Sequence, residues 1–460
     1  MRRVFPFVLA FAAGCSVGPK YEKPAVELPE TWKETAPRFA EDGRWWRIYQ
    51  DSSLETAVEE ALAHNADLLI AAARVDEARA LLGEANSFFW PSLSAQASAS
   101  RQEVSTRTAT FFSGIPREYN HHRATLNVSY ELDLFGRLRS NAAAARAELE
   151  ASEASREAVR LALAAQVARS YFALRALDEQ VLLTRRNVAL REEALALQRR
   201  RLQGGVISEF DLRQLEAEAA QVRALLPPLE REREREEVAL SVLLGRSPKQ
   251  VFEGNVKVKD SVDETPGPAA IPSGLPSELL LRRPDLVEAE RVLAAANARI
   301  GVARAEMFPS IALTGFLGSE SAALSNLFSG GAAATWQIAA SVTQPIFQGG
   351  RLQARAEAAE ARERAALAQY QQAIRAAFGE VRSALIAQSR ALESYQAESV
   401  RAAALAESLR LARLRYQNGV ASQLDVLDAE RGLLAAQIAR VEALRAHRAA
   451  VADLFRALGG

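Results

Sequence analysis

Gly205-Val206-Ile207-Ser208-Glu209-Phe210-Asp211 is a glycine turn followed by a helix start, and it returns 214 residues later as Gly419-Val420-Ala421-Ser422-Gln423-Leu424-Asp425. An earlier run that begins at Asp67-Leu68 recurs from Asp285-Leu286 with an offset of 218. The chain therefore contains two copies of one long unit. Such a duplication favours a pseudo-symmetric tube around an axis over a cleft built around a reaction.

Two very long helices are predicted before the two glycine turns. Residues 138–203 contain no proline or glycine, and residues 351–417 contain only Gly379. At 1.5 Å per residue, each segment could extend for roughly 100 Å as one helix. Pro227-Pro228 has no counterpart in the second copy and predicts a break in the returning helix of the first. The charge runs 199–201 and 230–237 are interpreted as solvated helix faces.

The glycine turns predict the tips of two antiparallel helical hairpins. Gly205 and Gly419 stand where helices commonly end, and Ser208 and Ser422 are placed as N-caps of the helices that follow. The tips are therefore expected at residues 204–211 and 418–425.

Four segments alternate between apolar and polar residues, at about 92–103, 121–135, 309–319 and 335–347. This period of two fits either a half-buried soluble sheet or a membrane strand that faces lipid on one side. The carboxylates Glu131 and Asp133 on the polar face favour a water-filled interior. Phe316 falls on the side otherwise occupied by Ala312 and Thr314.

The strands also predict an oligomer. No stretch beyond the N-terminus approaches the roughly 18 apolar residues of a spanning helix. A membrane barrel needs about eight strands, and open strand edges are not tolerated in lipid. If these strands span a membrane, several copies must join.

The N-terminus predicts export and lipidation. Arg2-Arg3, the apolar stretch 4–11 and Ala12-Ala13-Gly14 form a signal peptide over residues 1–14. Cys15 follows directly, as in bacterial lipoprotein signals, and is the expected site of a covalent diacylglycerol and N-acyl lipid. The alternative is an ordinary signal peptide with an incidental cysteine.

Composition excludes several functions. Lys and Arg number 57 against 57 Asp and Glu, so no basic field recruits nucleic acid. His121-His122 has no neighbouring ligands to complete a metal shell, and we expect no metal site. No P-loop, zinc-spaced cluster or nucleophile elbow occurs, so we expect neither an enzyme nor a bound cofactor.

The order and spacing of several motifs resemble the TolC-type outer membrane efflux channels, in the lipoprotein branch that includes OprM and NodT. The motifs are Val17-Gly18-Pro19-Lys20-Tyr21-Glu22-Lys23-Pro24, Trp45-Trp46, Leu281-Arg282-Arg283-Pro284-Asp285-Leu286, Ala296-Asn297-Ala298-Arg299-Ile300-Gly301, Phe308-Pro309-Ser310, Pro345-Ile346-Phe347 and Gly349-Gly350-Arg351. The resemblance covers essentially the whole mature chain.

The resemblance implies a mostly α-helical fold with a transmembrane β part and an internal duplication. Three protomers would give a 12-stranded β-barrel that continues into a 12-helix periplasmic α-barrel with a mixed equatorial domain. Residues 15–50 would wrap the equator and 247–280 would link repeat 1 (51–246) to repeat 2 (281–457).

The resemblance also implies a function. The homotrimer would be a passive outer membrane exit duct, lipid-anchored and extending into the periplasm. It would work with a periplasmic adaptor (membrane fusion) protein and an inner membrane transporter. Trp45-Trp46 suggests a transporter of the resistance-nodulation-division type.

The same resemblance assigns roles to tip residues. Asp425 and Asp428 would ring the periplasmic aperture and select for cations, and crowding in the ring would remove part of their charge near neutral pH. The alternative is that they are helix-start carboxylates favoured by the macrodipole. Asp211 and Tyr416, with Gly205 and Gly419 of the turns, would serve tip closure and adaptor contact. Ala421 stands where the family's closing network has an arginine.

Two other functions stay open at this stage. The first is the outer membrane channel of a type I protein secretion system, and the second is a lipid-anchored periplasmic scaffold that does not span. The four alternating segments argue against the scaffold. The cargo is not encoded in any motif, although the presence of only Met1 and Met307 gives no support to a methionine relay for soft metals.

Overall fold

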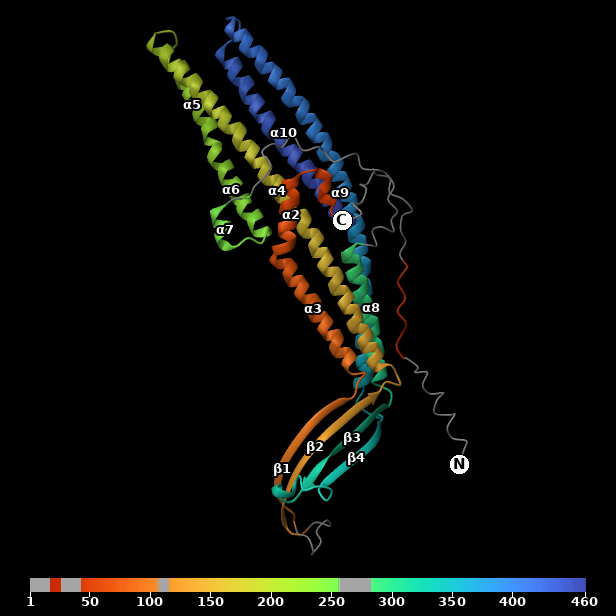
Figure 1. Ribbon diagram of the computed structural model, residues 1–460. Helices are drawn as coiled ribbons and strands as arrows, with labels where there is room; N and C mark the ends of the chain where they lie inside the picture. Colours follow the sequence, from red (N-terminus) through yellow and green to blue (C-terminus); the bar gives the residue numbers. More distant parts are fainter. Residues whose placement is uncertain (1–16, 26–42, 106, 108–115, 255, 257–282) are drawn as a thin grey trace. The chain divides into compact units, whose positions relative to one another are not determined.

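The computed structural model describes residues 17–25, 43–105, 107, 116–254, 256 and 283–460 (Figure 1). Cys15, the predicted signal peptide 1–14 and most of the predicted linker 247–280 lie outside these residues. The chain divides into two compact units, with the divisions falling inside four of its helices, and each unit is described by itself.

The first unit contains a four-stranded antiparallel sheet in the order β1-β2-β3-β4. Its strands are β1 (Ser92–Glu103), β2 (Glu118–Leu132), β3 (Ser310–Ser321) and β4 (Ala334–Thr343), and a short 3-10 helix, η4 (Leu324–Asn326), lies between the last two. β2 and β4 end earlier than the alternation predicts. After β2, Asp133 accepts hydrogen bonds from the backbone N–H groups of Leu138 and Arg139 at the start of a helix. After β4, Pro345 has no N–H to continue the ladder.

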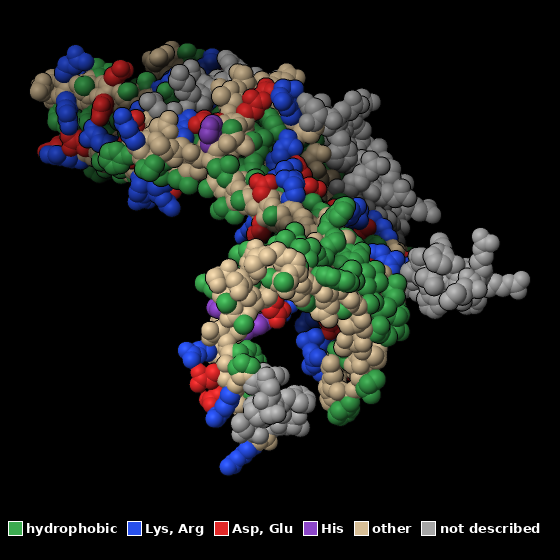
Figure 2. Space-filling view, turned by 60° about the horizontal axis from the view of Figure 1, so that its bottom comes forward, with side chains coloured by type: hydrophobic (Ala, Val, Ile, Leu, Met, Phe, Trp, Pro, Cys, Tyr) green, Lys and Arg blue, Asp and Glu red, His purple; other side chains and the backbone are tan. Residues whose placement is uncertain are grey.

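The register of the sheet separates two faces. Val128 pairs with Leu93 and with Gly315, and Gly315 pairs with Ile338. This face carries the exposed apolar side chains of the alternating segments: Leu93, Leu126, Val128, Leu313, Leu317, Trp336, Ile338 and Val342. In Figure 2 the sheet curls forward, and charged and histidine side chains are visible in its hollow.

The opposite face carries mainly polar and small side chains, and Phe316 is a large apolar residue among them. Asn127 pairs with Ser94 and with Phe316 on this face. The guanidinium carbon of Arg123 lies 4.3 Å from the centre of the Phe316 ring. A cation over the ring face is an attractive contact, which explains how an aromatic residue sits among polar neighbours.

The two carboxylates that the alternation places on the polar side, Glu131 and Asp133, both bind arginines. Glu131 accepts two hydrogen bonds from Arg137, at 2.8 and 2.7 Å. Asp133 lies beyond β2, where it also accepts a bond from Arg139 Nε at 3.1 Å. Both carboxylates therefore fix the junction between strand and helix.

Parts of four helices complete this unit: α3 (Ala66–Ser87), α4 (Arg137–Gln203), α8 (Pro284–Ala305) and α9 (Arg351–Gln417). Ion pairs give their spatial order as α3-α4-α8-α9. They join Arg79 to Glu153, Arg291 to Glu150, and Arg304 to Glu360. α4 and α9 each run unbroken for 67 residues in the whole chain. None of the helices in the described part of the chain is both long and apolar enough to cross a membrane.

The second unit consists of helices: η2 (Trp45–Tyr49), α2 (Ser52–His64), α5 (Glu209–Ala224), α6 (Leu226–Leu243), α7 (Pro248–Glu253) and α10 (Gln423–Leu458), with the remainder of α3, α4, α8 and α9. α5 and α6 are separated at Leu225, and Pro227 stands in the first turn of α6. α10 runs through the matching position without a break, since Val441-Glu442 replace the two prolines.

The core of this unit surrounds one buried ion pair. Trp45, Tyr49 and Phe455 pack with Ala164 and Ala168 of α4 among the fully buried residues. Asp51 caps α2 through the backbone N–H groups of Ser53 and Leu54. Its carboxylate lies 2.8 Å from Arg175 Nη1, and the two side chains are 0% and 1% exposed.

Each repeat is closed by the same contact. Asn65, before α3, donates from Nδ2 to the carbonyl oxygen of Leu243 at 2.9 Å. Arg283, before α8, donates from Nη1 to the carbonyl oxygen of Ala457 at 2.7 Å. Leu243 and Ala457 are equivalent under the 214-residue offset. In both repeats, therefore, the residue just before the equivalent helix, α3 or α8, binds the end of a later helix of the same repeat, α6 or α10.

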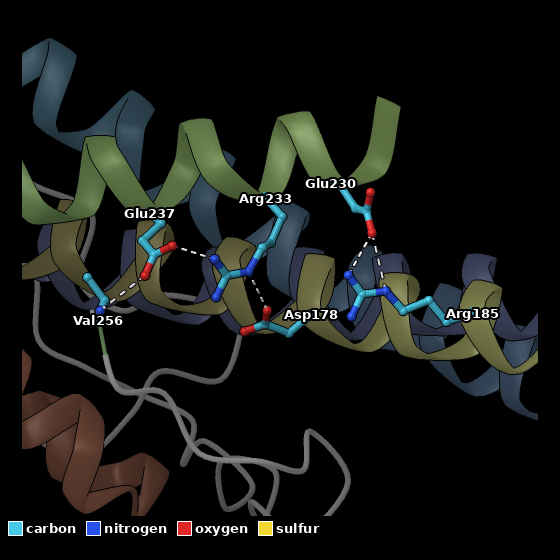
Figure 3. Close-up of polar contacts among 6 residues, drawn as sticks. All are labelled: Asp178, Arg185, Glu230, Arg233, Glu237 and Val256. Atoms are coloured by element: carbon cyan, nitrogen blue, oxygen red, sulfur yellow. Dashed lines mark hydrogen bonds and ion pairs between the residues drawn. The ribbon is translucent and has the colours of Figure 1, made fainter. Parts of the chain in front are cut away.

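The charge run 230–237 is only partly a solvated face. Glu230 accepts from Arg185 of α4, and Arg233 donates from Nε to Asp178 at 2.8 Å (Figure 3). Arg233 also pairs with Glu237, which accepts from the Val256 N–H at 3.2 Å. These side chains recur every three to four residues, so they share one side of α6. That side binds α4, so the interpretation of the whole run 230–237 as a solvated face is wrong.

Candidate functional site: the hairpin tips

The tips are glycine turns of the same geometry in both repeats. Gly205 and Gly419 have φ angles of +72° and +75°. The next residue donates its N–H five residues back, from Val206 to Arg201 and from Val420 to Arg415, at 2.9 Å in both cases. The left-handed φ favours glycine, because a Cβ there is strained even in open space.

Asp211 and Asp425 belong to capping boxes rather than to the turns. Each lies three residues after its N-cap serine, in the first turn of α5 or α10. The Asp425 carboxylate accepts from the Ser422 N–H at 2.8 Å and from the Ser422 hydroxyl at 2.9 Å. The hydroxyl bond, followed by the N–H bond and the attraction of Arg415, lowers the pKa of Asp425 below its usual value. Within one copy, Asp425 is therefore held in its charged form, which opposes the predicted loss of charge.

Asp428 lies one turn further along α10 and is specific to the second repeat. Its carboxylate is about half exposed and pairs with Arg431. The equivalent position in the first repeat is Gln214. Asp425 and Asp428 are thus both exposed at the start of α10, but neither is without a hydrogen-bond or ionic partner.

Tyr416 has an arginine partner from the other hairpin. Its hydroxyl accepts from Arg201 Nη1 at 3.3 Å. The sequence placed Arg201 on a solvated face and identified only the missing arginine at Ala421. The structure therefore gives Arg201 a role that sequence reasoning missed. Under the 214-residue offset, Arg201 corresponds to Arg415, the residue directly before Tyr416. This equivalence was the signal in the sequence that could have indicated the contact.

In each hairpin, one ion pair joins the two helices, and the two ion pairs occupy equivalent positions of the repeats. Arg199 lies 3.0 Å from Glu216, and Arg413 lies 2.8 Å from Glu430 at the equivalent positions. In the second repeat, Glu430 also forms an ion pair with Arg191, whose side chain is 4% exposed. Arg191 Nη1 lies 3.2 Å from Glu430 Oε2. This additional arginine comes from α4 and joins the two hairpins.

The two hairpins also meet across a groove of about 280 Å³. It is lined by Asp211, Gln214, Leu215, Ser422, Gln423, Leu424 and Leu427. Gln198 Nε2 donates to Gln423 Oε1 at 3.1 Å beside it. Leu212, Leu215 and Leu427 are buried in a common apolar cluster below. The tip is therefore a packed contact between repeats with an exposed carboxylate on each side.

Comparison with known protein families shows to which family the chain belongs. The model of the family described as "Outer membrane efflux protein" matches residues 57–246 and 275–460. The chain belongs to this family. The match covers both repeats, including both hairpin tips.

Individual relatives agree with the family. The probable efflux pump outer membrane protein TtgC of Pseudomonas putida is 35% identical, over 97% of this chain and 93% of its own length. The cation efflux system protein CusC of Escherichia coli is 33% identical, over 100% and 98%. The solved structure of the Neisseria gonorrhoeae MtrE outer membrane channel in its open state has a TM-score of 0.83 and 35% identity, over 97% and 98%.

These findings confirm the predicted family and fold class. The outer membrane efflux protein family consists of transport proteins, and this chain is the outer membrane exit duct of an efflux pump, extending into the periplasm. Within the described residues, no group of three or more metal-ligating side chains occurs. The roles predicted for Asp425, Asp428, Asp211 and Tyr416 stay predictions. Cys15 lies outside the described residues.

Proposed function

We propose that three copies of this chain form one closed channel across the outer membrane, which passively releases small molecules delivered by a periplasmic adaptor and an inner membrane transporter. The sheet carries the proposal. Among the residues that the structure describes, β1 pairs only with β2 and β4 pairs only with β3, so two strand edges are available to further copies. Lipid cannot satisfy open backbone groups, and four strands are too few to close.

The apolar face of the sheet supports a membrane location for the strands. Ile338 is 83% exposed and Trp336 is 73% exposed on this face. Burying apolar surface in lipid is favourable by about 25 cal/mol per Å². A face of this kind suits lipid, while the opposite face, with Asn127 and Arg123, suits a wet lumen. The lipid-anchored scaffold that does not span gains no support from it.

The partners are proposed from the family. The relatives are named as parts of efflux pumps, which favours a pump-driven export channel over a type I secretion channel. The exposed tips, with their groove between Asp211 and Leu424, are the surface that we assign to the adaptor.

We also propose that no covalent reaction takes place in the duct. CusC is named for cation efflux and TtgC is not, so the names do not agree on a cargo.

The test is to isolate the mature protein from outer membranes without boiling. We expect a heat-modifiable trimer that conducts ions in planar bilayers. The same preparation tests the N-terminus, where we propose that Cys15 is the first residue and carries the acyl chains. If mass spectrometry finds an unmodified N-terminus that begins at another residue, the lipoprotein assignment is wrong. A soluble, non-conducting monomer would contradict the proposed channel itself.

The aperture role of Asp425 and Asp428 predicts a change in ion selectivity. Replacing both residues with alanine is expected to reduce the preference for cations, because it removes two carboxylates per copy, or six per trimer, from a narrow ring. The measured quantity is the reversal potential under a salt gradient. Trimer stability is expected to change by only about 0.3 to 1 kcal/mol per helix start.

The matched control is Asp211→Ala, which removes the equivalent capping box from α5 and leaves the α10 carboxylates in place. We expect it to shift the reversal potential much less than the double variant does. Equal shifts from both variants, or none from the double variant, would mean that these aspartates act only as helix-start residues.

A further inference from the structure

A cavity of about 380 Å³ lies in the first unit, where the sheet meets the starts of α4 and α9. Its wall includes Glu131, Ser310 and Thr343 of the strands. The register places these three residues on the polar face of the sheet, which also carries Asn127. The cavity is thus on the side that the proposed channel assigns to the lumen, and its volume is in the range of pockets that bind small molecules.

The wall of this cavity carries one cation that no carboxylate balances. Each carboxylate of the wall is already held by an arginine: Glu131 by Arg137 at 2.7 Å, Glu306 by Arg355 at 2.8 Å and Asp133 by Arg139 at 3.1 Å. Arg351 also lines the cavity and is exposed. Its guanidinium donates to the neutral amide oxygen of Gln348, and among the residues that the structure describes it forms no ion pair.

The first repeat shows which group is missing beside Arg351. Under the 214-residue offset, Arg351 corresponds to Arg137, whose guanidinium donates two hydrogen bonds to the carboxylate of Glu131. The position of Glu131 becomes Pro345, which also lines the cavity but has no acceptor in its side chain. The second repeat therefore keeps the arginine and lacks the carboxylate that neutralises it in the first repeat. An anion from outside the chain can take that place.

The cavity also offers an apolar surface beside the arginine. Phe135 and Phe308 line it and stack with their ring centres 4.9 Å apart. Phe308 is 39% exposed, so part of its ring is open to contact, and Pro309 and Leu352 extend the apolar wall. Inorganic phosphate would use only the guanidinium. A ligand with both a carboxylate and an aromatic body would use the whole wall.

We propose that this cavity binds aromatic organic carboxylates, with the carboxylate of the ligand on Arg351 and its ring against Phe135 and Phe308. The ligand would complete, in the second repeat, the ion pair that Glu131 and Arg137 form in the first. A bound molecule would occupy the polar side of the sheet, in the path that the channel offers to its cargo. The location in the lumen rests on the proposed function, whereas the binding itself does not.

Binding is tested by calorimetry on the full chain purified in detergent, with naphthoate as the probe. Naphthamide has the same ring without the charge, and we expect wild type to bind it at least about tenfold more weakly, since the charged contact with the guanidinium is lost. Arg351→Gln is expected to weaken naphthoate binding by a similar factor. Arg123→Gln is the matched control, because it removes a cation from the same face outside the cavity, and it should leave the affinity unchanged. Equal binding of naphthoate by wild type and Arg351→Gln would overturn the site.

A second measurement tests the location of the site. In planar bilayers, naphthoate is expected to lower the ion current through the wild-type channel at concentrations where naphthamide does not, and Arg351→Gln should remove this block. Binding of naphthoate without block would overturn the location in the lumen. A wild-type protein that binds naphthoate but does not conduct would contradict the proposed function and support the anion site, so the two failures are distinguishable.

Discussion

Replacing Arg175 with methionine is expected to lower the stability of the protein by about 3 to 5 kcal/mol, because it leaves a buried carboxylate without its counter-charge. Asp51 Oδ2 lies 2.8 Å from Arg175 Nη1, and neither side chain is more than 1% exposed. The Tyr171 hydroxyl also bonds the carboxylate, at 2.9 and 3.0 Å to its two oxygens. The Tyr171 hydroxyl and the capping N–H groups of Ser53 and Leu54 would remain, but these neutral donors do not replace the counter-charge of a carboxylate that water does not reach.

The measurement is the thermal or urea midpoint of the purified protein in detergent. Arg185→Met is the matched control, because it removes an arginine of the same helix from an exposed pair with Glu230. Its cost is expected to stay within about 1 kcal/mol. Asp51→Asn combined with Arg175→Met removes both charges and should recover part of the loss. A midpoint for Arg175→Met equal to that of Arg185→Met would show that the ion pair contributes little.

The duplication made most of the fold predictable. Two segments almost free of helix breakers became α4 and α9, and the alternation of Thr125 to Leu132 became a strand with its apolar residues on one face. These patterns are local, so a single sequence is sufficient to recognise them. Pro227-Pro228 similarly predicted the separation of α5 from α6.

Long-range side-chain contacts were not predictable in the same way. Nothing near Arg175 in the sequence indicates that its partner is Asp51, because the two positions are brought together only by packing. The same holds for Arg201, which binds Tyr416 from the other hairpin. Comparing the repeats position by position would have indicated some of these pairs, since Arg199–Glu216 and Arg413–Glu430 are equivalent.

The candidate site was predictable in its residues and less so in its chemistry. Asp211 and Asp425 were identified as tip carboxylates, and the structure gives both a second role as capping residues. A carboxylate three residues after a serine is a general helix-start signal, so sequence alone could not separate the two roles. The repeat helps here, because Asp428 has no charged counterpart and carries no cap.

Val128→Arg is expected to abolish assembly of the channel, whereas Asn127→Arg is expected to be tolerated. The two residues are neighbours in β2, but their side chains lie on opposite faces. Val128 is on the apolar face, paired with Leu93 and Gly315, and is 40% exposed. Asn127 is on the polar face between Ser94 and Phe316. The proposed channel places the first face in lipid and the second in the lumen.

The size of the expected difference follows from the membrane. An arginine that faces lipid near the middle of the bilayer costs about 2 to 4 kcal/mol, and three copies would multiply that cost in one trimer. Asn127→Arg instead adds a cation to a face that already carries Arg123, where water can solvate it. The yield of heat-modifiable trimer from outer membranes compares the two variants directly. Equal yields would show that the strand register, or the assignment of its apolar face to lipid, is wrong, because no other property distinguishes these adjacent positions so strongly.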